Sequence, residues 1–335
     1  MAATIKDIAL KAGVSAATVS RVLTNKEGFF GDKTAKKVRD AAKELGYRKN
    51  TSAMELVTKK SNDLAVIVNA TKTNFSNSII DGIQETAFPE NLNVIILYAG
   101  DEDSERQKRA INTVVERSVM GVLLLSVDLA PENLEILQSA NIPFCFLSIS
   151  LDERNLPFIS SDDFQIGYQA TKYLIDQGHT KIGLAGLDYQ HTITGTLRLN
   201  GYKKALSDAK IKFDEDWLSE GDYSYEAGKN TMSKYTAKTN LTAVVCGSDW
   251  AAIGVMNEAR SLGLSVPENI SIVAIDGTEL CKIVQPQLTS VTQSFYEMGV
   301  SGVNWLLNKE TRTEQSITPI EIHSRQSVRR LTMND

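Results

Sequence analysis

The chain has 335 residues, 42% of them apolar, and it is longer than one ordinary domain, so two or three folded units are expected. Charge is uneven: residues 1–60 hold 13 Lys plus Arg against 6 Asp plus Glu, a net of +7, whereas the remaining residues hold 23 against 35, a net of −12. No stretch approaches the ~18 consecutive apolar residues that span a bilayer, and the N-terminus has no apolar signal core, so a cytoplasmic location is expected.

The first stretch, Thr4 to Leu23, predicts two short helices joined by a tight turn. Apolar residues recur at helical spacing, Gly13 ends the first helix, and the hydroxyl of Ser15 can cap the second. A third helix, Lys33 to Leu45, closes the unit. This is the pattern of a helix-turn-helix, and the basic charge of the unit suits a DNA-binding head on an acidic body.

The outward face of the second helix carries small side chains, which would let the helix enter a major groove. Ala16 and Ala17 can read methyl groups and shape, whereas Arg21 can fork onto a guanine. Thr18 and Ser20 are expected to hold phosphates. The remaining predicted DNA contacts in this unit are Thr4, Ser15 and Asn25.

Residues 48–62 are polar and basic with a short apolar segment, and by themselves they read as a flexible linker. Beyond them, continuous apolar strands alternate with helices of 10 to 15 residues. This pattern predicts an α/β fold with parallel sheets covered on both faces. The expected strands are Leu64–Val68, Val94–Leu97, Val122–Leu125, Phe144–Leu147, Ile182–Ala185, Ala243–Cys246 and Ile272–Ile275. The expected helices are Ser78–Phe88, Ser104–Arg117, Pro131–Ala140, Phe164–Gln177, Leu197–Ala209, Tyr225–Tyr235 and Trp250–Leu262.

Ligands of open α/β sheets bind beyond the carboxyl ends of the strands, so the segments just after the predicted strands are candidate binding loops. Catalytic signals are absent from the sequence: it contains no G-x-S-x-G elbow, P-loop or strand-linked G-x-G-x-x-G, and no enzyme activity is expected. The three histidines are widely spaced, and neither a metal site nor a cofactor is expected. Three dispersed cysteines are expected to be buried free thiols.

A collinear set of motifs resembles the LacI/GalR family of bacterial transcription regulators. The set begins with T-I-K-D-I-A-L-K-A-G-V-S-A-A-T-V-S-R-V-L at Thr4–Leu23 and E-L-G-Y at Glu44–Tyr47. It continues with G-H-T-K-I-G at Gly178–Gly183, R-L-N-G-Y at Arg198–Tyr202, S-D-W-A-A-I-G at Ser248–Gly254 and V-P-E-N-I-S-I-V-A-I-D at Val266–Asp276. Because the motifs cover nearly the whole chain in order, they are far more specific together than any one alone.

The resemblance implies a hinge in residues 48–62, with Leu56 wedged into the minor groove of DNA. Met54 and Glu55 replace the arginine and serine usual in the family, so the hinge contacts differ in detail. It also implies a core of two similar halves, between which the chain crosses back near Thr289–Gln293. The implied divisions are a head at 1–47, a hinge at 48–62 and a core at 63–335, with one half formed by 63–159 plus 293–323 and the other by 160–292. Helix 295–307 and strand 317–322 should then join the first half.

The resemblance narrows the ligand site to a few residues. Arg198 matches a family arginine that grips effector hydroxyls or a carboxylate, and Asp276 matches an aspartate that accepts from hydroxyls. Tyr223 falls where an aromatic ring faces the effector. Ser248 and Ser161 stand where an asparagine and an aspartate are common, which alters the expected polar contacts. Phe75 and Thr194 complete the expected effector site.

These observations predict a homodimeric transcriptional regulator, of repressor type, for a carbohydrate-utilisation operon. It would bind a pseudo-palindromic operator on double-stranded DNA, and a sugar or sugar phosphate in the core would change its DNA affinity. Two alternatives remain open at this point. A partner protein could control the regulator instead, as in catabolite-control members of the family, or the core could belong to a solute-binding protein.

Overall fold

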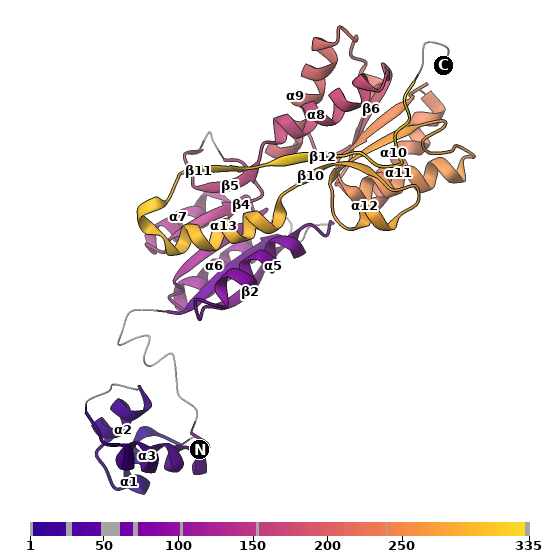
Figure 1. The fold of residues 1–335 in the computed structure, drawn as a ribbon. Helices are drawn as coiled ribbons and strands as arrows, with labels where there is room; N and C mark the ends of the chain where they lie inside the picture. The colour runs from indigo at the N-terminus through magenta and orange to yellow at the C-terminus, as the bar shows by residue number, and fades with distance from the viewer. Residues whose placement is uncertain are drawn as a thin grey trace. The chain divides into compact units, whose positions relative to one another are not determined.

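The computed structural model describes residues 3–24, 29–47, 61–69, 73–100, 103–151, 154–238 and 240–331. The fold is α/β, and the chain separates into two compact units, residues 1–61 and 62–335 (Figure 1). No described helix is long and apolar enough to cross a membrane. Residues 48–60 of the predicted hinge, including Leu56, lie outside the described residues.

The first unit is a bundle of short helices, α1 (Ile5–Ala12), α2 (Ala16–Leu23) and α3 (Asp32–Glu44). Its core consists of Ile8, Ala9, Val19, Val22, Ala35, Val38, Ala41 and Ala42. Gly13 lies between α1 and α2 with a φ of 66°, the left-handed conformation in which its amide reaches back to the carbonyl of Ala9. This turn sets the angle between the first two helices, as the sequence predicted.

The second unit contains two six-stranded sheets. The first has the order β11-β5-β4-β3-β1-β2, and its described strands pair in parallel. Its elements are β1 (Asp63–Asn69), α5 (Ser76–Ala87), β2 (Asn93–Gly100), α6 (Ser104–Glu116), β3 (Gly121–Leu125), α7 (Pro131–Ser139), β4 (Phe144–Leu147), β5 (Phe158–Ser161), α13 (Phe295–Leu307) and β11 (Gln315–Thr318).

The second sheet has the order β12-β10-β9-β8-β6-β7, and it is parallel except for β12, which runs antiparallel to β10. Its elements are α8 (Asp163–Asp176), β6 (Ile182–Leu187), α9 (Ile193–Asp208), β7 (Leu218–Glu220), α10 (Tyr225–Lys238), β8 (Ala243–Cys246), α11 (Asp249–Ser261), β9 (Ser271–Asp276), α12 (Leu280–Ile283), β10 (Thr289–Gln293) and β12 (Ile320–His323).

Side chains on alternate faces of each strand enter separate cores. On β1, Ala65 and Ile67 pack with α6 and α7, whereas Leu64, Val66 and Val68 pack with α5 and α13. The second sheet is covered in the same way by α10 and α11 on one face and by α8 and α9 on the other. Both sheets are therefore buried on both faces, which explains their continuous apolar strands.

The C-terminal segment departs from the predicted arrangement. The strand expected at 317–322 is two strands, because Pro319 interrupts it: β11 extends the first sheet and β12 joins the second. In the described core, the chain thus passes between the sheets at Asp162, Ser294 and Pro319. The predicted crossing near 289–293 is one of these passages, although β10 itself pairs with β9 in the second sheet.

Candidate functional site

The exposed face of α2 carries the small side chains predicted to face DNA. Ala16, Ala17, Ser20 and Arg21 are exposed, whereas Val19 and Val22 are fully buried. The guanidinium carbon of Arg21 lies 5.2 Å from the ring centroid of Phe29, whose side chain is also exposed. Arg21 is thus held at the surface by a cation–π contact.

Two predicted DNA contacts, Ser15 and Thr4, cap helix N-termini in this structure. The hydroxyl of Ser15 caps α2, accepting from the amide of Thr18 at 3.1 Å, and it also lies 2.9 Å from the Thr18 hydroxyl. Thr4 forms a capping box with Asp7 at the start of α1, and the Thr4 hydrogen bonds lower the pKa of the Asp7 carboxyl. Asn25, the remaining predicted contact in this unit, lies outside the described residues.

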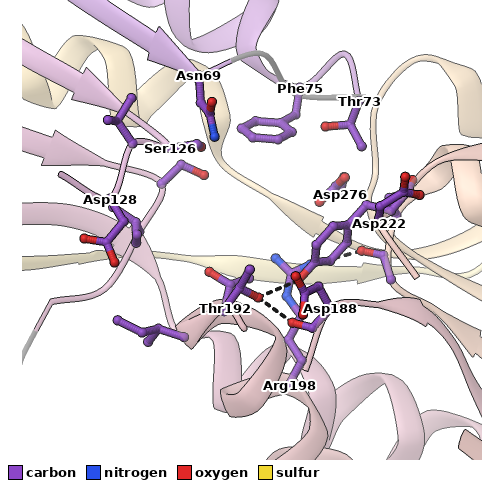
Figure 2. A pocket seen from close by; sticks show the side chains of 18 of the residues that line it. Asn69, Thr73, Phe75, Ser126, Asp128, Asp188, Thr192, Arg198, Asp222 and Asp276 are labelled. Carbon is purple, nitrogen blue, oxygen red and sulfur yellow. Dashed lines mark hydrogen bonds between the residues drawn. The ribbon is translucent and has the colours of Figure 1, made fainter. Parts of the chain in front are cut away.

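A cavity of about 370 Å³ lies in the second unit where the carboxyl ends of both sheets meet. Eight strands contribute lining residues at or just beyond their carboxyl ends: Asn69 at the end of β1, Ser126 after β3, Ser148 after β4, Asp188 after β6, Asp222 after β7, Gly247 after β8, Asp276 at the end of β9 and Gln293 at the end of β10. Figure 2 shows Asn69, Ser126 and Asp128 on one side, facing Thr192, Asp188 and Arg198 on the other. This is the position at which open α/β sheets bind ligands.

Six of the seven predicted ligand residues line the cavity. They are Phe75, Thr194, Arg198, Tyr223, Ser248 and Asp276. Ser161 does not line it, which corrects the prediction. Ser161 is buried within β5, where its hydroxyl lies 3.2 Å from that of Thr318 on β11, so it joins strands instead of facing a ligand.

Ser248 lines the cavity, but its hydroxyl is already used. It donates to the carbonyl oxygen of Tyr223 at 2.6 Å and accepts from the amide of Ala251 at 3.0 Å, which caps α11. Ser248 therefore has a structural role, and one lone pair of its hydroxyl oxygen is left for the predicted contact with a ligand.

Arg198 lies on the floor of the cavity in a buried ion pair. Its Nε atom donates to Oδ1 of Asp163 at 2.8 Å, and a terminal N–H donates to the carbonyl oxygen of Gly247 at 3.0 Å. Burial raises the pKa of Asp163 and opposes the charge of Arg198, but the carboxylates of Asp163 and Asp276 keep the pKa of Arg198 above its usual value. Arg198 therefore remains a fixed positive charge.

Asp276 ends β9 with a φ of 107°, and Oδ1 accepts from the side-chain amide of Gln293 at 2.9 Å. Burial, followed by the charge of Asp249, raises its pKa well above the usual value. Asp249 is itself buried and accepts from the amides of Gly277 and Thr278. Because two buried carboxylates repel each other, one proton is retained on this pair more readily than on an exposed aspartate.

Aromatic rings lie on both sides of the cavity. Phe75 stacks on Phe295 with ring centroids 4.9 Å apart. The hydroxyl of Tyr223 lies 3.2 Å from that of Thr192, and burial raises the pKa of the phenol. The rings offer flat apolar surfaces beside the polar groups, as a ligand with both C–H faces and hydroxyls requires.

Several lining residues were not predicted individually. Asn69, Ser148, Asp188 and Thr192 lie in segments that follow the predicted strands, and their position after a strand end was the available signal. Further unpredicted lining residues are Ser126, Asp128, Asp222 and Gln293. The hydroxyl oxygen of Ser126 is buried and has no hydrogen-bond partner among the described residues.

One group of side chains at the rim has the composition of a metal site. Donor atoms of Asp188, His191 and Glu220 lie within 4.8 Å of one another. However, Nδ1 of His191 is 3.1 Å from Oδ1 of Asp188, and the side chains of His191 and Glu220 are exposed. A hydrogen bond explains the arrangement without an ion.

Comparison with known sequences finds a match in each of the two units. Residues 4–50 match the lacI family of bacterial regulatory proteins, and residues 171–328 match a periplasmic binding protein-like domain. Catabolite control protein A of Priestia megaterium is 33% identical over 336 residues, covering 98% of this chain and all of the relative. The transcriptional repressor PurR of Pasteurella multocida is 31% identical and covers 98% of both chains.

Solved structures agree with this assignment. A transcription regulator from Lactobacillus plantarum is 46% identical over 81% of this chain and 100% of its own, with a TM-score of 0.73. The lac repressor dimer bound to operator and the anti-inducer ONPF is 27% identical over 98% of this chain and 100% of its own, with a TM-score of 0.87. A regulator from Weissella paramesenteroides with bound sucrose is 30% identical over 81% of this chain and 100% of its own, with a TM-score of 0.72.

Proposed function

Because the chain belongs to the lacI family of bacterial regulatory proteins, it is a DNA-binding transcription repressor, and we propose that a sugar-type ligand in the cavity controls its affinity for an operator. The matched relatives are transcription regulators, so the chain is not an enzyme. The head also distinguishes it from a solute-binding protein.

One observation carries the proposal: a polar cavity lies where the strand ends of two sheets meet within a single unit. Arg198 and Asp276 offer a fixed cation and a carboxyl group to ligand hydroxyls, and Tyr223 and Phe75 offer flat faces. The relative with bound sucrose supports a sugar as the type of ligand. The regulated genes would then encode carbohydrate utilisation.

We propose that the active form is a homodimer in the cytoplasm, where it meets the chromosome. The dimeric lac repressor bound to its operator supports this assembly. Two symmetric heads match the two halves of a pseudo-palindromic operator. Ala16, Ala17 and Arg21 contact bases in this proposal, and Thr18 and Ser20 approach phosphates.

Ligand control requires that closing the cavity shift the two halves of the core and so change the geometry of the linked heads. A thousandfold change in operator affinity corresponds to about 4 kcal/mol of coupling. This exceeds the roughly 1–3 kcal/mol of a typical allosteric pair, but two ligand sites in a dimer can supply it.

The test uses the full-length protein. DNA fragments enriched from genomic DNA by binding are labelled, and their affinity is measured by fluorescence anisotropy with and without glucose, sucrose, cellobiose and ribose. The proposal predicts that one of these sugars changes the affinity for the enriched fragment and leaves binding to random DNA unchanged. If no sugar changes it, control by a partner protein replaces the proposal.

A further inference from the structure

The cavity has a strongly acidic lining. Asp128, Asp188, Asp222 and Asp276 line it, and Arg198 is the single Lys or Arg among the described lining residues. Asp128 also pairs with Arg154, through contacts of 2.5 and 3.0 Å, but Arg154 does not line the cavity. Even with Asp276 protonated, carboxylates outnumber the lining guanidinium.

The guanidinium of Arg198, the lining cation among the described residues, is already partly bonded within the protein. An arginine binds phosphate or carboxylate best through two parallel N–H groups. The Nε–H of Arg198 is already donated to Asp163, and another N–H is donated to the carbonyl oxygen of Gly247. A ligand anion would therefore meet a guanidinium whose charge is already matched by a buried carboxylate.

The N-termini of α9 and α11, which reach the cavity, are already capped by side chains of the protein. Helix N-termini attract anions because their first amides lack partners. Thr192 caps α9 by accepting from the amide of Gly195, and Ser248 caps α11. Asp249 adds a buried carboxylate in the first turn of α11. These caps leave little positive potential for a phosphate group.

The same lining is suited to hydroxyl groups. A hydroxyl can donate to a carboxylate and accept from an N–H at the same time. Arg198 has five N–H donors, and two are used in its bonds to Asp163 and Gly247. The unpartnered Ser126 hydroxyl lies on the opposite side of the cavity, where it can bond to a second ligand hydroxyl (Figure 2).

We infer that the cavity selects a polyhydroxylated ligand without negative charge and rejects the phosphorylated or carboxylated forms of the same molecule. This inference rests on the proposed function and narrows its ligand class. Like-charge repulsion from Asp128, Asp188 and Asp222 opposes an anion, and the guanidinium of Arg198, already paired with Asp163, does not offset it. A neutral sugar does not meet this repulsion.

The experiment measures binding to the full-length protein by calorimetry. Glucose, ribose and sucrose are compared with glucose 6-phosphate, ribose 5-phosphate and sucrose 6-phosphate, respectively, and glucose is also compared with gluconate. The expected result is that the neutral sugar that binds does so at least tenfold more tightly than its phosphorylated or carboxylated form, which corresponds to about 1.4 kcal/mol.

The possible outcomes distinguish failure of this inference from failure of the proposed function. A sugar phosphate or gluconate that binds as tightly as the neutral sugar, while still changing operator affinity, overturns the inference and leaves the proposed function standing. If no member of the panel binds, the proposed function fails, and the inference fails with it.

Charge-removing variants test the cause of the selectivity. The double variant Asp128→Asn, Asp188→Asn keeps the shape of the lining and is expected to bring the neutral and phosphorylated affinities within about threefold. As a control, Asp81→Asn removes a negative charge from the exposed face of α5, outside the lining. This variant should retain the tenfold preference for the neutral sugar. Unchanged selectivity in the double variant would show that shape, not charge, excludes the anion, and would overturn the electrostatic argument.

Discussion

The guanidinium of Arg198 is held by the carboxylate of Asp163, with Nε and Oδ1 2.8 Å apart and both side chains at most 7% exposed. Arg198 comes from α9 and Asp163 from the first turn of α8, so the pair joins two helices packed on one face of the second sheet. The cation that lines the cavity is thus also part of the core packing of that half.

Removing one member of this pair should destabilise the protein strongly. Asp163→Ala leaves Arg198 charged and buried without its carboxylate, and we expect the free energy of unfolding to fall by about 3–5 kcal/mol. Urea denaturation of the full-length protein measures the loss. As a control, Arg154→Ala breaks the half-exposed pair with Asp128 and should lower stability by less than about 1 kcal/mol. Equal losses in the two variants would contradict the assigned role of burial.

The buried carboxyls of Asp249 and Asp276 predict a pH dependence of stability. Since their pKa values are raised in the folded state, that state binds more protons than the unfolded state. Stability contributed by the pair is therefore present at low pH and is lost as pH rises above about 3.9, the usual pKa of aspartate, towards the raised value.

Asp276→Asn removes the contribution of Asp276 to the pH dependence of stability, because the asparagine amide is uncharged at both pH 5 and pH 8. We expect the stability of the variant relative to the wild type to increase between pH 5 and pH 8, as measured by urea denaturation at each pH. An unchanged difference across this range would show that Asp276 ionises normally in the folded protein.

Two substitutions of Ser15, the residue that caps α2, distinguish its effect on the stability of the head from its effect on DNA binding. Ser15→Ala removes the hydroxyl that accepts from the Thr18 amide, and the head should lose about 1 kcal/mol of stability. Ser15→Asp keeps an acceptor at this position but adds a negative charge at the DNA-facing end of α2, so it should retain stability and weaken all DNA binding. Hydrogen exchange of head amides and anisotropy titrations measure the two effects. If Ser15→Asp binds DNA as tightly as the wild type, this end of α2 is not part of the DNA interface.

Arg21 is predicted to supply specificity and lysines to supply general attraction. Arg21→Ala should weaken operator binding by about 1–3 kcal/mol while leaving salt-sensitive binding to random DNA nearly intact. Lys36→Ala removes an exposed charge from α3. This variant should weaken binding to operator DNA and to random DNA to a similar extent. Preserved preference in Arg21→Ala would exclude Arg21 as a base-reading residue.

The sequence predicted those parts of the fold in which local pattern and packing agree. Continuous apolar strands such as Val122–Leu125 and amphipathic helices such as α6 were found because burial on both faces leaves a clear periodic signal. β5 was missed because half of its residues are serines, although all four are buried. The division at Pro319 was missed because the two strands on either side pair with different sheets, which only long-range contacts determine.

The site was predicted less completely, for a related reason. Resemblance identified Arg198, Tyr223 and Asp276, but it did not reveal that the Ser248 hydroxyl is used within the protein. Ser126 itself has a φ of 52° just beyond β3, and its sequence context gives no sign of that conformation. The acidic lining arises from residues that are far apart in the chain and meet only at the strand ends.

The central claim is that the cavity and the head are thermodynamically coupled, and linkage offers the most direct test. A ligand that changes operator affinity by a given factor must have its own affinity changed by the same factor when operator is bound. The measurement is the sugar dissociation constant of the full-length protein with and without saturating operator DNA. We predict that the two constants differ by the factor by which the sugar changes operator affinity. Equal constants would contradict the account.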